Sequence, residues 1–234
     1  PARGGSKRFP NKNIVLLHGR PIIEYPIKAA KESGLFSRIV VSTDSDAILQ
    51  VSQDAHTDVA LRPAALATDT TPLVDAVLDF VDGQRWKHGL LTHPSAQTQA
   101  VQSVETICIL LPTSGLVTPQ DLKGAWDMMQ WNKADGVMAT TDYSAHPYQA
   151  LTFGKDGWFQ PALPDFVNMQ SQDLPPFFVD AGMFYFVRVE AIRAARSFYV
   201  PKLLGYYIPR SRAIDIDTPE DLRLMEAIKG SKIE

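Results

Sequence analysis

The segment RIVVSTDSDAILQVSQDA, residues 38–55, contains the pattern that sets the fold class. Its first part is an apolar run that ends in Ser42, Thr43 and Asp44, which predicts a buried strand with polar residues at its carboxyl end. In the second part, DAILQVSQDA, apolar residues recur at helical spacing, which predicts a helix. A strand followed directly by a helix is the repeating unit of α/β proteins.

The same alternation continues along the chain. We expect further strands in the segments DVAL, ICILL, VMATT, AGMFYFV, GYYI and AIDID, and a helix in TPLVDAVLDFV. Thr118 and Thr218 each precede a proline, a pair typical of a helix N-cap and the first helical position. The alternation predicts a three-layer α/β/α fold with a mainly parallel, mixed sheet and a ligand crevice at the carboxyl ends of the strands.

Composition and charge limit the possible functions. The 234 residues are 45% hydrophobic and 21% charged with a net charge of -3, the balance of one ordinary globular domain spanning residues 1–234. No apolar run approaches the roughly 20 residues of a membrane span, so we expect no membrane association and a cytoplasmic location. No long cationic stripe is present, which argues against nucleic-acid binding. Cys108, the single cysteine, lies in ICILL and is expected to be a buried small hydrophobe.

Two segments interrupt the alternation. Residues 83–105 are rich in Gln and His, and we expect a long surface excursion in which His88 and His93 are solvated. Residues 142–179 carry prolines and aromatics in place of the α/β rhythm. These aromatics either form a partner surface or fold back onto their own core.

The chain opens with PARGGSKRFPNKN, which places four cations around two glycines: Arg3, Lys7, Arg8 and Lys12 around Gly4 and Gly5. Glycines let backbone amides approach a ligand closely, and amides together with several cations suit a polyphosphate. The spacing matches neither GxxxxGK[ST] nor GxGxxG, which argues against a P-loop ATPase and a dinucleotide-binding enzyme. The alternative is a solvated basic turn.

A second candidate site lies in AIDIDTPED, residues 213–221. In an extended strand, Ile214 and Ile216 can enter the core while Asp215 and Asp217 share the other face, with Cα atoms about 6 to 7 Å apart. Two carboxylates at this spacing can hold Mg²⁺ together with water and a substrate phosphate. In the alternative interpretation, Asp217 is a turn residue before the Thr218 cap and Asp215 is merely exposed.

These motifs occur in an order that resembles a known family. PARGGSKRFPNKN is followed by RPAALATDTT, PTS, SQDLP, DAGMFYF and DIDTPEDL, as in bacterial cytidylyltransferases that activate nine-carbon sialic-acid-like sugars. The chain resembles the N-acylneuraminate (nonulosonic acid) cytidylyltransferase family, and SQDLP with DAGMFYF most resembles its pseudaminic acid branch. The resemblance implies a Rossmann-like nucleotide-diphospho-sugar transferase fold and a homodimer formed through residues 142–179. It also implies a Mg²⁺-dependent reaction of CTP with a nonulosonic acid, giving a CMP-sugar and pyrophosphate.

Carried over by motif, the resemblance implies three groups of site residues. Arg3, Lys7 and Asp217 would be catalytic, with Mg²⁺ held by Asp215 and Asp217. The nucleotide would be bound by Arg3, Gly4, Gly5, Ser6, Lys7, Asn13, Arg62, Asp69, Thr70 and Thr71. The sugar would be contacted by Gln172, Asp173, Asp180, Phe184 and Tyr185. For Phe184 and Tyr185, a plain core strand is the competing interpretation.

The sequence departs from the family pattern at three places. Leu111 stands where sialic-acid members often have glutamine, and Gly115 stands where proline is usual. The family also has an apolar strand before the opening loop, so we expect further residues ahead of Pro1. The general base is left open between Asp217, a metal-bound hydroxide and the substrate itself. Alternative functions are a nucleotidyltransferase using another NTP or 3-deoxy-manno-octulosonic acid, and a non-catalytic CTP-binding relative.

Overall fold

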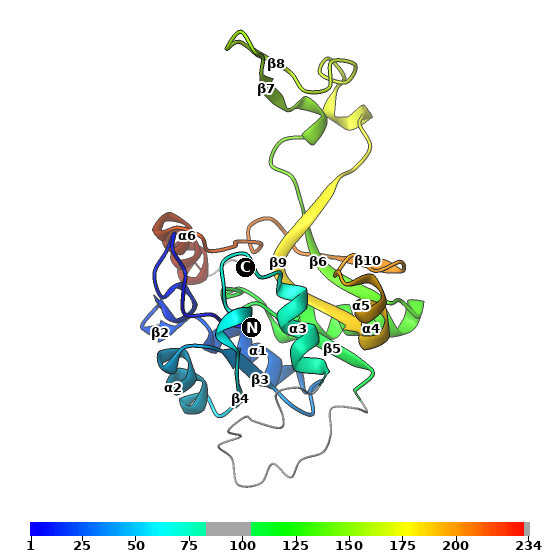
Figure 1. The fold of residues 1–234 in the computed structure, drawn as a ribbon. Coiled ribbons are helices and arrows are strands. Elements are labelled where there is room, and N and C mark those ends of the chain that lie inside the picture. Colours follow the sequence, from blue (N-terminus) through cyan, green and yellow to red (C-terminus); the bar gives the residue numbers. More distant parts are fainter. Residues whose placement is uncertain (83–103, 232–234) are drawn as a thin grey trace.

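The computed structural model describes residues 1–82 and 104–231. Its central element is a four-stranded sheet in the order β10–β6–β9–β5 (Figure 1). The strands are β5 (Thr106–Leu110), β6 (Gly136–Asp142), β9 (Phe178–Arg188) and β10 (Leu203–Tyr207). β10 is parallel to β6, whereas β9 is antiparallel to both β6 and β5, so β9 alone in this sheet runs in the opposite direction. The predicted α/β fold with a mixed sheet is confirmed.

A separate parallel pair is formed by β3 (Val40–Thr43) and β4 (Asp58–Leu61). Helix α2 (Asp46–Asp54) connects them, and the Ser45 side chain caps it by accepting a hydrogen bond from the backbone N–H of Ile48. This β–α–β unit is the one that residues 38–55 predict. The short helix η2 (Ala64–Leu66) follows β4.

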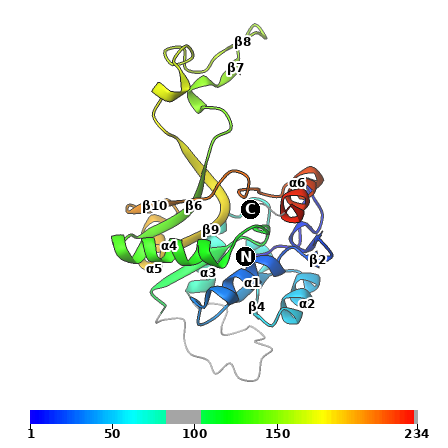
Figure 2. The ribbon, with the colours of Figure 1, turned by 180° about the vertical axis from the view of Figure 1, so that it is seen from behind.

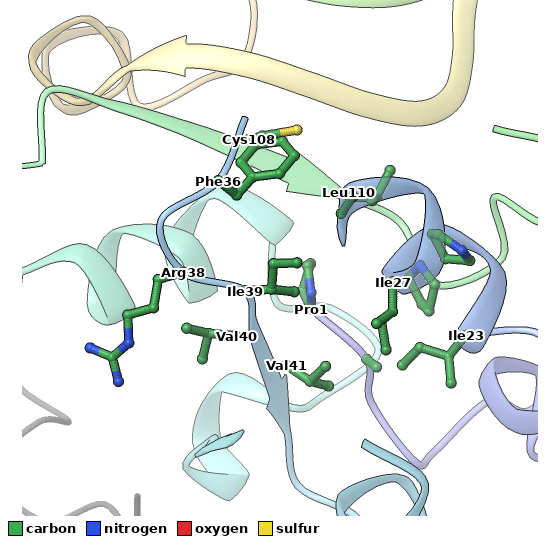
Figure 3. A pocket seen from close by; sticks show the side chains of 14 residues that line it. Pro1, Ile23, Ile27, Phe36, Arg38, Ile39, Val40, Val41, Cys108 and Leu110 are labelled. Carbon is green, nitrogen blue, oxygen red and sulfur yellow. The ribbon is translucent and has the colours of Figure 1, made fainter. Parts of the chain in front are cut away.

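A small apolar pocket of about 110 Å³ lies between β3 and β5 (Figure 3). Phe36, Val41, Cys108 and Leu110 are among its lining residues, and the ring of Pro1 also faces it. Burial raises the pKa of the Cys108 thiol, which agrees with its predicted role as a small hydrophobe. This mainly apolar lining is not suited to a polyphosphate.

Helices cover both faces of the four-stranded sheet (Figures 1 and 2). On one face, α1 (Glu24–Ser33) and α4 (Pro119–Asn132) pack in a core that includes Phe184. On the other face, α3 (Leu73–Val81) and α5 (Val189–Ala195) pack in a core that includes Tyr185. Adjacent residues of one strand thus enter opposite cores, which gives the three layers.

The last helix, α6 (Pro219–Gly230), packs with the short antiparallel strands β1 (Leu16–Leu17) and β2 (Arg20–Pro21), which follow η1 (Lys12–Ile14). Both predicted N-caps are confirmed, because Thr118 and Thr218 each form a capping box with the aspartate three residues later.

The strand predicted in AIDID does not form. Residues 213–217 pair with no neighbouring strand, although the alternation of burial persists: Ile214 and Ile216 are buried, while Asp215 is open to solvent. An extended backbone is sufficient for this alternation, and a β-ladder is not required.

Residues 143–177 leave the body between β6 and β9 as a projecting arm (Figures 1 and 2). The arm contains the antiparallel strands β7 (Leu151–Phe153) and β8 (Phe159–Pro161) and the short helices η4 (Pro147–Gln149) and η5 (Ser171–Asp173).

The aromatics of this arm divide into two sets. Tyr148 packs against Phe166 and Phe177, with ring centroids 4.4 and 4.8 Å apart, and so belongs to a small core within the arm. Phe153, Trp158 and Phe159 of the β7–β8 hairpin are exposed. The aromatics of the first set thus fold back onto a core of their own, and for the exposed second set a partner surface stays a prediction.

Most of the excursion predicted at residues 83–105, with His88 and His93, lies outside the described residues. In the part of the chain that the structure describes, no helix has the length and apolar character that crossing a bilayer requires.

Candidate functional site

A cavity of about 250 Å³ opens where β4 and β5 end. Arg62 follows β4 directly, and Leu111, Pro112 and Thr113 follow β5. This is the position predicted for a ligand crevice in an α/β sheet. Six of the predicted site residues line it: Arg3, Asn13, Arg62, Asp69, Thr71 and Asp215. Lys12, Leu111 and Thr113 also line it, although the motifs did not assign them to the site.

The opening loop is anchored to the body at its start. The buried amide of Asn13 donates a hydrogen bond to the carbonyl of Arg3 at 2.8 Å, and the N–H of Gly4 donates to the Asp44 carboxylate at 2.9 Å. A Cβ on Gly4 would lie 2.8 Å from the Cβ of Ser45, so the loop approaches the start of α2 too closely for any larger residue. Gly4 and Asn13 therefore position the loop backbone in this structure.

One carboxylate pairs with the first two cations of the loop. Arg3 Nη1 lies 2.7 Å from Asp69 Oδ1, and Lys7 Nζ lies 2.7 Å from Asp69 Oδ2. Hydrogen bonds from Lys7 and Arg3 lower the pKa of Asp69, which keeps this carboxylate ionised at neutral pH.

A second carboxylate pairs with the other two cations. Arg8 Nη1 lies 2.8 Å from Asp217 Oδ2, and Lys12 Nζ lies 3.0 Å from Asp217 Oδ1. Lys12 also donates a hydrogen bond to the carbonyl of Ile216 at 3.1 Å. The four cations of the loop are thus divided into two pairs, each facing one aspartate.

Asp215 is open to the cavity beside these groups, and Thr113 donates a long hydrogen bond of 3.4 Å to its carboxylate. Although the side chain is open to solvent, the surrounding protein removes enough water to raise its pKa; Asp217 raises it further, and Lys12 acts in the opposite direction.

The residues at this corner fit a hard divalent cation. Asp215 and Asp217 interact electrostatically, and both Lys12 and Arg8 already lie against the Asp217 carboxylate, which shows that this corner attracts positive charge. Within the described residues, no group of three or more His, Cys, Asp or Glu could hold a metal ion. Mg²⁺ commonly takes one or two carboxylates and completes its shell with water and substrate phosphate, so two aspartates are sufficient.

Strand β9 has an irregular register with β6 at a point close to the site. Its pairing with β6 jumps from Met138 opposite Tyr185 to Thr140 opposite Asp180. Within this jump Gly182 has a φ of 61°, which favours glycine, and a Cβ there would lie 3.5 Å from the Asp215 carboxylate. The motif DAGMFYF therefore forms a bulge whose backbone passes beside Asp215.

The predicted sugar-contacting residues of β9 have structural roles here. Asp180 accepts a hydrogen bond from the N–H of Gly182 at 2.8 Å and another from the Tyr185 hydroxyl at 2.6 Å. Phe184 has no exposed surface, and Tyr185 is buried and stacked on Phe198. Neither ring faces the cavity, because the two side chains enter the cores on either side of the sheet. The core-strand interpretation describes them in this structure.

The other predicted residues lie outside the cavity lining. Gln172 and Asp173 are exposed on η5 in the arm, where Gln172 donates a hydrogen bond to Gln170. Five others belong to the two segments that border the cavity: Gly4, Gly5, Ser6, Lys7 and Thr70. Asp217 also lies outside the lining and is linked to it by its ion pair with Lys12, which does line the cavity.

The structure shows what surrounds Leu111 and Gly115, the two substitutions in the family pattern. Leu111 lines the cavity and packs partly against the core that contains Tyr185. A Cβ on Gly115 would lie 2.6 Å from the Met225 sulfur and 3.0 Å from a Leu17 methyl group. A proline would not fit here without movement of α6 or the β1–β2 hairpin, so the glycine is explained by local packing.

Comparisons with known proteins show which family the chain resembles in sequence. A family model described as cytidylyltransferase matches residues 1–83, from the opening loop through α3. The CMP-N,N'-diacetyllegionaminic acid synthase of Legionella pneumophila is 31% identical over 97% of this chain and 93% of its own. The pseudaminic acid cytidylyltransferase of Campylobacter jejuni serotype O:23/36 is 28% identical over the same shares. The N-acylneuraminate cytidylyltransferase of Streptococcus agalactiae serotype V is 26% identical over 94% of this chain and 50% of its own.

Two solved structures share the fold. A CMP:2-keto-3-deoxy-manno-octonic acid synthetase complexed with CTP has a TM-score of 0.67 at 14% identity, covering 98% of this chain and 95% of that one. A 4-diphosphocytidyl-2C-methyl-D-erythritol synthase from Anaerococcus prevotii has a TM-score of 0.61 at 10% identity, covering 93% and 92%. The fold is therefore the Rossmann-like fold of nucleotide-diphospho-sugar transferases. The chain belongs to the N-acylneuraminate (nonulosonic acid) cytidylyltransferase family.

Proposed function

We propose that this protein transfers the cytidylyl group of CTP to a free nonulosonic acid, giving a CMP-sugar and pyrophosphate. The observation that carries the proposal is the cavity at the ends of β4 and β5, which Arg3 and Lys12 of the cationic loop line together with Asp215. Lys12 also pairs with Asp217, which lies just outside this lining. Relatives named for pseudaminic, legionaminic and N-acylneuraminic acids match nearly the whole chain at 26 to 31% identity, which supports the substrate class. The use of CTP points to the cytoplasm as the place of reaction.

The chemistry follows from the charges around the cavity. A sugar hydroxyl attacks the α-phosphorus of CTP and loses its proton to a general base, and the bond from this phosphorus to the pyrophosphate oxygen breaks. Such transfers are catalysed mainly by in-line positioning and by cations at the charged oxygens. Arg3 and Lys7 would hold the triphosphate, with Arg62 and the turn from Asp69 to Thr71 near the nucleoside. Arg62 is itself braced by a hydrogen bond to the Ser42 carbonyl at 3.0 Å.

Asp215 and Asp217 would hold Mg²⁺, which neutralises charge on the phosphate oxygens when bound. Asp217 can use its oxygens for a metal only if it gives up part of its pairing with Arg8 and Lys12. These two cations would then be available to the triphosphate. Metal and nucleotide should therefore bind cooperatively.

A thermal-shift comparison of CTP, UTP, ATP and dTTP with Mg²⁺ tests the nucleotide assignment. CTP should raise the melting temperature most, because the site is proposed to prefer cytosine. A ligand at 100 times its Kd stabilises a protein by about 2.7 kcal/mol, which is large enough to measure. Arg3→Ala should abolish the shift, whereas Arg38→Ala, in an ion pair with Asp58 away from the cavity, should keep it. Equal shifts with all four nucleotides would contradict the preference for cytosine, and no shift with any of them would contradict the function.

We also propose that the protein is a homodimer formed through the arm at residues 142–179. The support is the exposed face of the β7–β8 hairpin, which carries Leu151, Phe153, Trp158 and Phe159 on a segment that projects from the body. Exposed large apolar side chains that gather on one segment are typical of interfaces. Gln172 and Asp173, on the same arm, remain proposed sugar contacts.

A further inference from the structure

The contact between Asp69 and the opening loop has the form of an anion-binding site that is already filled. Each oxygen of the Asp69 carboxylate faces a different cation, Arg3 on one side and Lys7 on the other, both at 2.7 Å. Two cations on two oxygens of one anionic group is the arrangement that a phosphate would receive from the same side chains.

We propose that Asp69 pairs with Arg3 and Lys7 when no nucleotide is bound and competes with phosphate groups for these two cations. The inference rests on the proposed function, because it takes these two cations as the binders of the triphosphate and of the departing pyrophosphate. It gives Asp69 a role at the phosphate-binding cations of the opening loop, whereas the family resemblance places this residue near the nucleoside.

The turn that carries Asp69 has hydrogen bonds besides the ion pairs of Asp69. They are formed by its own hydroxyl groups: Thr68 Oγ1 lies 2.6 Å from Thr71 Oγ1, and Thr71 donates to the carbonyl of Ala65 at 3.3 Å. When a phosphate takes Arg3 and Lys7, the carboxylate therefore remains at the rim of the cavity and is ready to pair with them again.

The contact is weak enough to exchange. The side chains of Asp69 and Lys7 are 36% and 84% exposed, and ion pairs between exposed groups contribute little net stability. Beyond the anchored Gly4, a Cβ on Gly5 would meet no atom within 4 Å, so the backbone here is not packed against a neighbour on that side. A polyphosphate carries more charge than one carboxylate and should displace it.

A competitor of this kind weakens every ligand that uses the two cations. Pyrophosphate, which has no base or ribose to add other contacts, should be affected most visibly, and its release after the reaction should be eased. Removing the Asp69 charge should free the cations and tighten pyrophosphate binding, whereas a residue that merely supports the site would weaken binding when replaced.

The test is isothermal titration of inorganic pyrophosphate, without metal and at low salt, into the wild-type protein and three variants. Asp69→Asn should bind pyrophosphate about three- to tenfold tighter, the range expected from losing two exposed ion pairs. Asp69→Glu, which keeps the charge, should return affinity toward the wild-type value. Asp58→Asn is the matched control, because it removes a 2.6 Å ion pair with Arg38 away from the cavity and should leave affinity unchanged.

Pyrophosphate inhibition of the reaction gives a second measurement, and the inhibition constant should fall by the same factor in Asp69→Asn. Wild-type protein that binds CTP, together with an Asp69→Asn variant that binds pyrophosphate no tighter, overturns this inference alone. Wild-type protein that binds neither CTP nor pyrophosphate overturns the proposed function and the inference with it.

Discussion

Lys12 is joined to Asp217 by an ion pair of 3.0 Å across 205 positions of sequence. The same ammonium group donates to the carbonyl of Ile216, so the end of the opening loop is fastened to the segment that carries both predicted metal ligands. The cations and the carboxylates of the proposed site are therefore assembled before any ligand binds. Asp217 must still give up part of this pairing when metal and nucleotide bind, so the groups are close together but their ion pairs have to change partners.

Replacing Asp217 with Asn should remove a charged ligand for Mg²⁺ and the partner of both Lys12 and Arg8. Turnover should fall by about a hundredfold or more, the usual cost of losing such an electrostatic contribution. The fold should remain, because Asp217 is only partly buried. Steady-state kinetics across a Mg²⁺ titration measure the effect, and near-normal turnover with unchanged Mg²⁺ dependence would show that this aspartate is only a turn residue.

Replacing the neighbouring Ile216 with Ala should have the opposite profile. Its side chain is fully buried in the cluster with Leu17 and Met225, so truncation should cost roughly 2 to 5 kcal/mol of unfolding free energy through cavity formation. Turnover per folded molecule should change little, since the carboxylates on either side remain. Urea unfolding gives the stability, and a loss below about 1 kcal/mol would mean that this segment is not packed as the structure shows.

Two exposed tryptophans allow a matched test of the proposed dimer. Trp158 in the arm is 75% exposed and Trp131 near the end of α4 is 89% exposed, so each can be changed to Ser without disturbing a core. Trp158→Ser should shift the mass seen by light scattering from dimer toward monomer at micromolar concentration, and Trp131→Ser should not. A wild-type protein that is monomeric under these conditions would contradict the dimer.

Asp121 should make stability depend on pH. Its side chain is buried; although burial alone would raise its pKa, hydrogen bonds from Arg212, at 2.7 and 3.0 Å, and from Thr118 lower the pKa overall. Because the pKa is lowered, the contribution of Asp121 to the free energy of unfolding is complete above the pKa of the unfolded state, about 3.9. It is lost as pH falls through the pKa of the folded state.

Asp121→Asn should therefore cost roughly 2 to 4 kcal/mol at pH 7, somewhat below the value for a fully buried pair because the Arg212 side chain is 29% exposed. The difference from wild type should shrink as pH falls below about 4. Denaturant unfolding at pH 7 and pH 3 measures it, and an equal difference at both values would contradict the linkage.

Local patterns predicted much of the fold. The strand, helix and cap signals at residues 38–55, Thr118 and Thr218 depend on neighbouring residues, and each appears as expected. AIDID failed as a strand because a ladder needs a partner that the local pattern does not contain. Phe184 and Tyr185 could not be assigned to a face, since a strand buried on both sides has no polar side.

The sequence predicted which segments form the candidate site, but it did not predict the contacts between their side chains. The motifs assigned Arg3, Asp69 and Asp215 to the site, and all three line one cavity. The pairing of Lys12 with Asp217 joins distant parts of the chain and has no local sequence pattern. The roles of Gly4 and Asn13 in anchoring the loop likewise depend on α2 and on the Arg3 carbonyl. Arg8 and Lys12 were loop cations to which the motifs gave no role, and this was the signal that could have identified Lys12.

The most direct test of the central claim is product analysis by mass spectrometry after incubation with CTP and Mg²⁺. The protein should be offered pseudaminic, legionaminic, sialic and 3-deoxy-manno-octulosonic acids in separate reactions. We expect a CMP-sugar and an equal amount of pyrophosphate with at least one of the three nine-carbon acids, and amounts lower by about a hundredfold or more when Asp217→Asn replaces the wild type over the same time. Formation of product only with 3-deoxy-manno-octulosonic acid, or with none of the four acids, would contradict the account.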